Sequence, residues 1–518
     1  MKKLPDNIAD FKTLIANDYI YIDKTKHIYD LLTGSGQNFF LSRPRRFGKT
    51  LLVSVLEQIF LGNRELFKGL WIDQSDYAWP KHPVLRLSMA GVDASTPKRF
   101  EENLILELHQ KAKSAKINLG KANTPASCFK TLILELAEQG KVAVLIDEYD
   151  YPILTHLQDL KTASEMRDIL KSFYGVLKDL DAQLRFVFLT GVTKFNKTSI
   201  FSGINNLRDL TLEKKAASLL GIEPDELKTY FSEHIHNVAI EQNKTDQQIF
   251  NELKTWYNGY RFSPDSEKRV YNPCSVLRCL IDGQFRNYWS QTGTPSFLVK
   301  LLKENNFPTL ELENLTLSEQ ELGTFEIEQL KLPTLLFQAG YLTIKDYDPE
   351  SNLYTLSYPN QEVSQSMIEF IAPMMTGQDS FVPWQALAAK LKKALALQDL
   401  ETFCSLLKPF FADIPYDLHI PLERYYQTVF YMLVKFMGAE IMTEEKTNIG
   451  RIDVVFQTPT QVYIVELKMG QSAQKALKQI KERHYAQKYT LLNKPMMAVG
   501  LAFDPASKNI VDQAWEVI

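Results

Sequence analysis

Two carboxylates and a lysine near the end of the chain have the types and spacing of a metal-dependent hydrolytic site. Asp453 precedes one apolar run, and Glu466 and Lys468 lie inside the next run, residues 462–468. Side chains of an extended strand alternate between its faces, so Glu466 and Lys468 point the same way. Two carboxylates can hold Mg²⁺, and an adjacent lysine can orient the attacking water or offset charge on a phosphate. These residues predict cleavage of a phosphodiester.

A plainer interpretation competes with this one. A Glu-x-Lys pair is common among charged sequences, and Glu466 and Lys468 would then form a salt bridge at a solvated sheet edge, where it contributes little stability. The residues around and after the pair are rich in basic side chains, with Glu482 opposing them, and they offer a local surface for phosphates or a solvated helix face. The basic residues are Lys468, Lys475, Lys478, Lys481, Arg483, Lys488 and Lys494.

Gly450-x-x-Asp453 followed by Glu466-x-Lys468 resembles the PD-(D/E)XK nuclease superfamily, over roughly the last quarter of the chain. The resemblance implies an α/β nuclease fold in which Asp453 and Glu466 hold the metal and Lys468 positions water.

The same family pattern places an acidic residue on the helix before the first strand, and Glu423 matches that place. A helix is expected over residues 473–485 after the Glu-x-Lys strand, because apolar residues recur there at helical spacing. Gln479 resembles the polar residue that the family carries on that helix.

A second candidate site begins at an apolar strand that leads into Gly48, Lys49 and Thr50, followed by an apolar helix over residues 51–60. Backbone N–H groups at a helix N-terminus bind phosphate oxygens, Lys49 would reach the β- and γ-phosphates, and Thr50 would bind Mg²⁺. Arg43 stands where the first glycine of this loop pattern is usual. The loop therefore departs from the strict pattern.

An apolar strand over residues 142–146 ends in Asp147 and Glu148. Its continuous apolar character predicts a parallel sheet covered on both faces. Asp147 would hold Mg²⁺ together with Thr50, and Glu148 would polarise the attacking water. The alternative is a strand-end turn that caps the next helix. A further strand, residues 185–189, ends near Thr190, which is expected to sense the γ-phosphate.

These segments together resemble the bacterial AAA-ATPase-like family, many members of which carry a C-terminal PD-(D/E)XK domain. The resemblance implies an α/β protein with three parts: an AAA-ATPase-like P-loop domain with a parallel sheet (1–285), a connecting helical and mixed lobe (286–385) and a PD-(D/E)XK nuclease-like domain (386–518). The segments that carry it lie at residues 22–25, 43–50, 145–150, 190–195, 201–206, 256–262, 271–273 and 288–295.

Two of these segments have plain structural interpretations and carry no assigned chemistry. Asn258-Gly259 between aromatic residues is a β-hairpin turn signal, and Asn272-Pro273 would begin a loop.

Length and composition set further limits. A chain of 518 residues exceeds one hydrophobic core, so two or three domains are expected. The formal net charge is only −3, so affinity for nucleic acid must come from a local basic surface. Four cysteines without a Cys-x-x-Cys pair argue against zinc and disulfides and favour a reducing cytoplasm. The apolar runs are shorter than the roughly 20 residues that span a bilayer.

The sequence thus predicts a hydrolase that uses ATP and Mg²⁺, in which an ATPase site is coupled to a nuclease acting on DNA or RNA. The alternative is a nucleotide-dependent switch that binds nucleic acid or protein partners without cleavage. Membrane partners are not expected, and the oligomeric state stays open.

Overall fold

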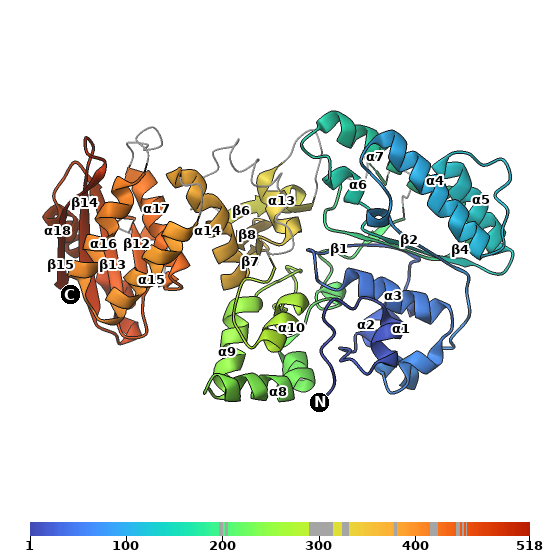
Figure 1. The fold of residues 1–518 in the computed structure, drawn as a ribbon, viewed down its shortest axis with the longest axis horizontal. Coiled ribbons are helices and arrows are strands. Elements are labelled where there is room, and N and C mark those ends of the chain that lie inside the picture. The colour runs from blue at the N-terminus through green and yellow to red at the C-terminus, as the bar shows by residue number, and fades with distance from the viewer. Residues whose placement is uncertain are drawn as a thin grey trace. The chain divides into compact units, whose positions relative to one another are not determined.

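The computed structural model describes residues 1–195, 200–201, 206–289, 314–323, 331–377, 381–414, 423–441, 446–447, 450–451 and 453–518 (Figure 1). The chain divides into two compact units. Unit 1 comprises Met1–Leu301 and Leu312–Glu362, and unit 2 comprises Leu302–Glu311 and Val363–Ile518. The three-part division expected from the sequence stays a prediction.

Unit 1 is built on a five-stranded parallel sheet with the strand order β2-β3-β4-β1-β5. Every residue of β1 and β3 is buried, as the continuous apolar runs predict. The strands are β1 (Asn38–Ser42), β2 (Val84–Ser88), β3 (Val142–Asp147), β4 (Leu184–Gly191) and β5 (Arg208–Asp209).

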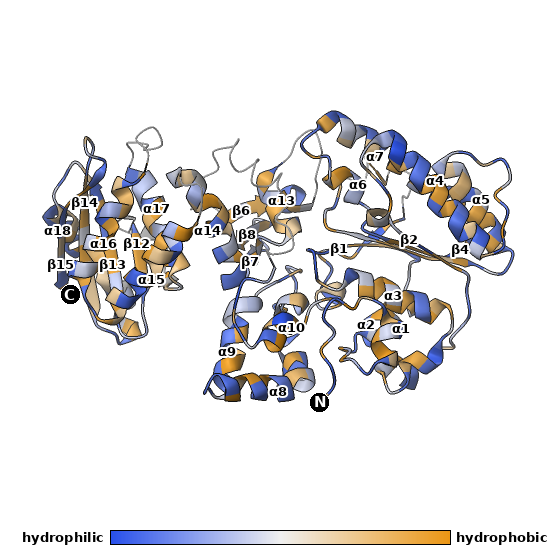
Figure 2. Cartoon of the chain, viewed as in Figure 1, coloured by the Kyte–Doolittle hydropathy of each residue, from blue (hydrophilic) through white to orange (hydrophobic). Residues whose placement is uncertain are grey.

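Helices cover both faces of this sheet, α1 to α3 on one face and α4, α5 and α7 on the other (Figure 1). Figure 2 shows largely hydrophobic residues on α3 and mixed faces on α4 and α7. Covering both faces removes the apolar strands from water, which is the main favourable contribution to folding. The helices are α1 (Phe11–Ala16), α2 (Thr25–Thr33), α3 (Lys49–Phe60), α4 (Pro97–Ser114), α5 (Pro125–Ala137), α6 (Tyr151–Leu154) and α7 (Leu160–Asp179).

The rest of unit 1 is mostly helical, with a small antiparallel sheet of strand order β6-β8-β7. The hairpin expected at Asn258-Gly259 is wrong, because α9 runs through Tyr257 and Asn258 is its C-cap residue. Gly259 follows with φ +105°, a conformation that favours glycine. The elements are α8 (Pro224–Glu241), α9 (Asp246–Tyr257), α10 (Pro273–Asp282), β6 (Leu315–Ser318), α12 (Glu319–Gly323), α13 (Leu332–Ala339), β7 (Thr343–Asp348) and β8 (Leu353–Ser357).

Unit 2 contains a mixed sheet of strand order β15-β14-β13-β12-β9, in which only the β13–β14 pair is parallel. The α/β class and the sheets expected for both parts of the chain are therefore confirmed. The strands are β9 (Glu440–Ile441), β12 (Val454–Gln457), β13 (Val462–Met469), β14 (Met496–Asp504) and β15 (Asn509–Val517), with a separate pair β10 (Lys446–Thr447) and β11 (Gly450–Arg451).

Helices pack against this sheet. The apolar side of α18, with Ala476, Leu477 and Ile480, is buried at the predicted helical spacing. Across the part of the chain that the structure describes, no helix is both long and apolar enough to cross a bilayer. The helices of this region are α14 (Gln361–Thr376), α15 (Val382–Ala396), α16 (Leu400–Ala412), α17 (Glu423–Phe436) and α18 (Ala473–Glu482).

Candidate functional sites

The predicted phosphate-binding loop lies between β1 and α3, where the sequence places it. Gly48 has φ +91° and Arg46 has φ +66°, so the loop needs left-handed backbone at both positions. The Lys49 ammonium donates hydrogen bonds to the carbonyls of Arg43 (2.9 Å) and Pro44 (2.8 Å). Burial lowers the pKa of Lys49 to about 8, although nearby carboxylates, Asp147 foremost, oppose the shift. The lysine is held inside its own loop by neutral carbonyl groups.

Arg43, which replaces the usual first glycine, is buried, and its side chain hydrogen-bonds to backbone carbonyl groups. Its guanidinium donates to the carbonyls of Ser42 and Thr211, both at 2.8 Å, and to the carbonyl of Ala216 at 2.9 Å. It also lies 4.1 Å from the centre of the Phe262 ring, in cation–π geometry. The Arg43 side chain thus forms hydrogen bonds to the segment that follows β5. It does not line the cavity described below.

The acidic turn after β3 lies beside this loop. Asp147 is buried and accepts a hydrogen bond from the Glu148 N–H at 2.9 Å. Glu148 has φ +49° and lines the cavity, and burial together with Asp147 raises its pKa. A raised pKa makes a carboxylate a better proton acceptor, as a general base requires.

Asp150, three residues beyond Asp147, was not singled out from the sequence. It is buried and accepts hydrogen bonds from the N–H of Val192 (3.0 Å) and the N–H and hydroxyl of Thr193 (both 2.6 Å). Burial raises its pKa in spite of these donors. The hydrogen bonds of Asp150 therefore connect the acidic turn to the segment that directly follows β4. The only sequence signal of Asp150 is its position two residues after Glu148.

Thr190 lies inside the sheet. Its hydroxyl is buried and donates to the carbonyl of Leu41 at 2.8 Å, and the side chain does not line the cavity. Thr190 is not among the residues that line the cavity with Lys49 and Thr50, and its contact with a γ-phosphate stays a prediction.

A cavity of about 540 Å³ opens over the loop and is lined by Gly48, Lys49, Thr50, Glu148 and Asp150 among others. Its other walls come from distant segments, the N-terminal residues 5–9 and the start of α10. Neither segment carries a motif that sequence reasoning would connect with phosphates. At this rim the Arg46 guanidinium donates to the Cys274 sulphur at 3.0 Å.

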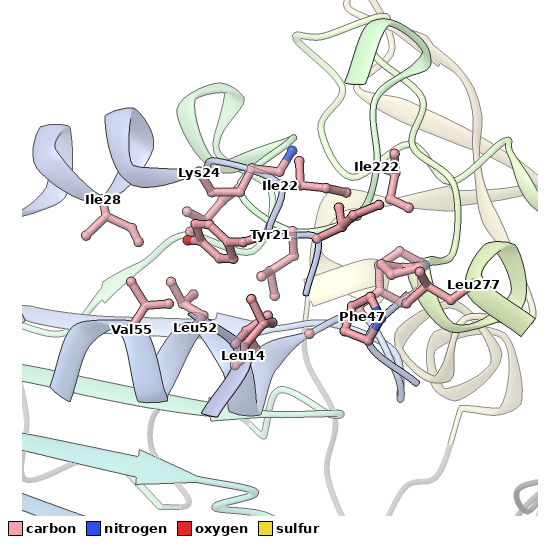
Figure 3. A pocket seen from close by; sticks show the side chains of 18 of the residues that line it. Leu14, Tyr21, Ile22, Lys24, Ile28, Phe47, Leu52, Val55, Ile222 and Leu277 are labelled. Carbon is pink, nitrogen blue, oxygen red and sulfur yellow. The ribbon is translucent and has the colours of Figure 1, made fainter. Parts of the chain in front are cut away.

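An apolar pocket, seen from close by in Figure 3, adjoins the cavity. The residues that line both are Pro5, Gly48, Leu51, Pro273 and Leu277. Tyr21, Ile22 and Phe47 lie on the walls of the pocket. Its charged lining residue Lys24 is paired with Glu226 at 2.7 Å. The cavity with the charged side chains and the apolar pocket thus share residues at the start of α3.

In unit 2 the four residues predicted for a nuclease site lie together. Glu466 and Lys468 lie on β13, Asp453 directly precedes β12, and Glu423 begins α17. The Lys468 ammonium lies 2.8 Å from Glu466 Oε1 and 3.8 Å from Glu423 Oε1. Asp453 Oδ2 accepts from the N–H of Leu467 at 2.7 Å, which fixes it against the same strand.

The surface-edge interpretation of Glu466 does not hold. β13 is an inner strand with β12 and β14 on its two sides, and Glu466 is only 1% exposed. Burying a charge in this way is costly unless partners compensate. The position therefore points to a functional use of the carboxylate.

Comparisons with known proteins agree with this arrangement. The family model described as "Predicted AAA-ATPase" matches residues 5–201, and that of the PD-(D/E)XK nuclease superfamily matches residues 422–513. An Azotobacter chroococcum mcd 1 protein, "Uncharacterized protein in vnfD 5'region", is 36% identical over 528 residues, which cover 98% of each chain. The chain belongs to this AAA-ATPase-like family with a PD-(D/E)XK domain. The resemblance predicted from the motifs is confirmed.

A second relative of this AAA-ATPase-like protein is "Antigen EM13" of Echinococcus multilocularis, which is 29% identical over 146 residues. That match covers 26% of this chain and 34% of the relative.

The residues of the PD-(D/E)XK site fit a hard divalent cation. Burial and repulsion from Glu466 raise the pKa of Asp453 to about 7, and burial also raises the pKa of Glu466. Glu466 Oε2 is buried and has no hydrogen-bond partner among the described residues. A nearby cation would relieve the repulsion and engage this oxygen.

The donor set is small. Among the described residues, no group of three or more His, Cys, Asp or Glu side chains could hold a metal ion. Mg²⁺ is commonly bound through one or two carboxylates, with water and substrate phosphates as further ligands. Asp453 and Glu466 are compatible with that mode.

Two glutamines support these carboxylates. Gln427 on α17 donates to Asp453 Oδ1 at 2.8 Å, and Gln479 on α18 donates to Glu466 Oε1. Gln479 was expected from the resemblance, whereas Gln427 was missed. Its position four residues after Glu423 on one helix was the available signal, because such residues share a helix face.

The basic surface expected beside this site is partly neutralised. Lys478 pairs with Glu482 at 3.5 Å and Lys481 pairs with Glu516 at 2.7 Å. Lys494 donates to Gln457 Oε1 at 2.9 Å. The Lys488 side chain lies outside the described residues.

Proposed function

We propose that this protein binds and hydrolyses ATP in unit 1 and cleaves nucleic-acid phosphodiesters in unit 2, each with Mg²⁺, and that the first activity controls the second. The observation that carries the nuclease assignment is the group formed by the buried Glu466 and the partly buried Asp453 and Lys468, with Glu466 Oε2 unpartnered among the described residues.

In unit 1 the cavity would take the phosphates and the adjoining apolar pocket would take the base. Lys49 would exchange its bonds to Arg43 and Pro44 for bonds to phosphate oxygens, a gain because charge-assisted bonds are stronger. Thr50 and Asp147 would hold Mg²⁺, which neutralises charge developing on the phosphates. Glu148 would accept the proton of the attacking water.

In unit 2 Asp453 and Glu466 would hold Mg²⁺, which acts as a Lewis acid and lowers the pKa of water. Lys468 is kept protonated by its carboxylate partners, which raise its pKa although burial alone would lower it. It would orient water or offset phosphate charge. Glu423 accepts from the Met469 N–H at 3.1 Å and lies near Lys468, so it would assist in placing that ammonium.

A cleavage panel tests the assignment. The purified full chain is incubated with single- and double-stranded DNA and RNA, with and without Mg²⁺ and ATP, alongside Asp453→Asn and Lys49→Ala. Cleavage is expected to require Mg²⁺ and to disappear in Asp453→Asn, with ATP turnover retained. Lys49→Ala should lose ATP turnover, and its cleavage should no longer respond to ATP. Cleavage by Asp453→Asn at the wild-type rate would refute the nuclease site.

The second candidate is a nucleotide-dependent switch that binds nucleic acid or a protein without cutting. The position of Thr190 inside the sheet, away from the cavity, favours slow or absent hydrolysis. ATP binding without turnover, and nucleic-acid binding that survives Glu466→Ala with no product in Mg²⁺ or Mn²⁺, would establish this alternative.

A further inference from the structure

A buried polar cluster lies where the aromatic segments without assigned chemistry converge in unit 1. The cluster consists of Tyr260, Asn272, Ser275 and Glu362, the last being fully buried. Glu362 Oε1 accepts from the N–H groups of Tyr288 (2.7 Å) and Trp289 (2.9 Å).

The other polar atoms of the cluster are less well paired. Glu362 Oε2, Tyr260 Oη, Ser275 Oγ and Asn272 Nδ2 are buried and form no well-directed hydrogen bond among the described residues, although Ser275 lies close enough to Glu362, and Asn272 to Tyr260, to oppose the rise in the pKa of each partner. Burial raises the pKa of Glu362 to about 7, and Glu362 adds to the effect of burial in raising the pKa of Tyr260. Buried polar groups normally form hydrogen bonds, so a cluster with poorly paired groups reduces the stability of the fold. A functional role would account for such a cluster.

The cluster is linked to the phosphate-binding loop by packing. The Phe47 ring lies 4.7 Å from the Tyr260 ring and 5.3 Å from the Phe262 ring, between centroids. Phe47 directly precedes Gly48 of the loop. A shift of the loop on nucleotide binding therefore changes the packing around Tyr260, because close-packed side chains transmit displacement.

A second link runs through α10. The Asn272 side chain caps this helix by accepting from the N–H groups of Cys274 (3.0 Å) and Ser275 (3.2 Å). Pro273 and Cys274 line the cavity above the loop. The same short segment thus contributes to the cavity wall and to the polar cluster.

Glu362 is the second residue of α14, a helix whose residues from Val363 onward belong to unit 2. Near its other end the Met375 carbonyl accepts from the Tyr425 hydroxyl at 2.8 Å. Tyr425 is on α17, which begins at Glu423 of the nuclease site. Within unit 2, the end of α14 is therefore hydrogen-bonded to the helix that carries a predicted nuclease residue.

We propose that Glu362 is a positioning residue that links nucleotide occupancy of the phosphate-binding loop to helix α14, by holding the start of α14 on Tyr288 and Trp289 beside Tyr260. This inference rests on the proposed function of unit 1. Linkage requires that the effect be reciprocal: nucleotide stabilises the attachment of α14, and loss of the attachment weakens nucleotide binding by the same factor.

The test uses the full chain and three variants. Glu362→Ala removes both bonds to the backbone, Glu362→Gln keeps an acceptor at Oε1, and Glu369→Ala is the matched control on the same helix. Nucleotide affinity is measured by calorimetry with a non-hydrolysable ATP analogue and Mg²⁺. We expect affinity to fall about tenfold in Glu362→Ala, in the usual range of coupling between sites. Glu362→Gln and Glu369→Ala should stay within about threefold of wild type.

Hydrogen exchange of residues 361–376 gives the second readout. The analogue should slow exchange in wild type, Glu362→Gln and Glu369→Ala, but not in Glu362→Ala at saturating analogue. A merely structural role would alter exchange equally with and without nucleotide. Unchanged α14 exchange in wild type saturated with analogue would overturn the inference, and this measurement decides even if Glu362→Ala does not fold. Absence of analogue binding to wild type would instead refute the proposed nucleotide site.

Discussion

The lysines of the two sites are held in opposite ways. Lys49 is buried against neutral carbonyl groups, which leaves its pKa lowered to about 8, whereas Lys468 is held by carboxylates that raise its pKa. Lys49 gains when an anion such as a phosphate replaces the carbonyls. In unit 2 the groups that lack compensation are the carboxylates Asp453 and Glu466. The comparison indicates that the first site is prepared for an anion and the second for a cation.

The largest expected effect comes from removing a carboxylate of the cation site. Glu466→Ala should reduce Mg²⁺-dependent cleavage on the order of 1000-fold, comparable to losing a principal electrostatic stabiliser in an enzyme. The measurement is the initial rate of product formation on the substrate that wild type cleaves best. Glu482→Ala, which removes an exposed acid on the neighbouring helix, should retain wild-type cleavage. A Glu466→Ala cleavage rate within tenfold of wild type would contradict the assignment of Glu466 to a cation site.

The second-largest effect is expected from removing Lys49 of the predicted anion site. Lys49→Ala should weaken binding of ATP and Mg²⁺ by about 100-fold, because the ammonium is the charge placed to bind phosphate oxygens. Calorimetry provides the affinity. Lys111→Ala, an exposed lysine paired with Glu107 on α4, should bind as wild type does. Equal affinities in the two variants would show that Lys49 does not face the nucleotide.

The raised pKa of Asp453 at the predicted cation site makes the stability of the fold depend on pH. The folded-state pKa of Asp453 is raised from 3.8 to about 7, so the folded protein binds the proton more tightly than the unfolded chain. Stability should therefore fall as pH rises between about 4 and 7. Thermal unfolding without metal should show a lower midpoint at pH 7.5 than at pH 5.5, with a smaller difference in Asp453→Asn.

Mg²⁺ should reduce that loss at pH 7.5, because it binds the deprotonated carboxylates of the folded state. The same Mg²⁺ concentration should leave the midpoint of Asp453→Asn nearly unchanged. A wild-type midpoint that ignores Mg²⁺ at both pH values would argue against a cation at this position.

The smallest expected effect is on a supporting side chain. Gln427→Ala should weaken metal binding by about 10-fold, since it orients Asp453 without being placed as a ligand, and outer partners of metal ligands commonly contribute this much. Mn²⁺ titration reports the affinity, with Gln398→Ala as an exposed control. A loss as large as that of Asp453→Asn would mean that Gln427 is itself a ligand.

Much of the candidate nuclease site could be predicted because its members are local in sequence. Side chains alternate along β13, so Glu466 and Lys468 lie on the same face of the strand. The neighbouring strand β12, which begins directly after Asp453, pairs with β13. The placement of Glu423 came from the family pattern. Gln427 was missed because one glutamine carries little signal without its partner.

The candidate nucleotide site could be predicted only in part. The strands, the loop and the acidic turn follow from local patterns, but the walls supplied by residues 5–9 and α10 come from distant segments without a motif. The Asn258-Gly259 turn signal was overridden because α9 continues through Tyr257, whose ring is fully buried. Tertiary packing decided both cases, and local propensity carries no information about it.

Asp453 and Glu466 are proposed to hold a divalent cation, and diffraction from crystals soaked in Mn²⁺ would locate that ion. We expect an anomalous peak within coordination distance of an Asp453 oxygen and of Glu466 Oε2, and no such peak in Asp453→Asn crystals. A fully occupied Mn²⁺ elsewhere in unit 2, with these two carboxylates bound only to protein groups, would contradict it.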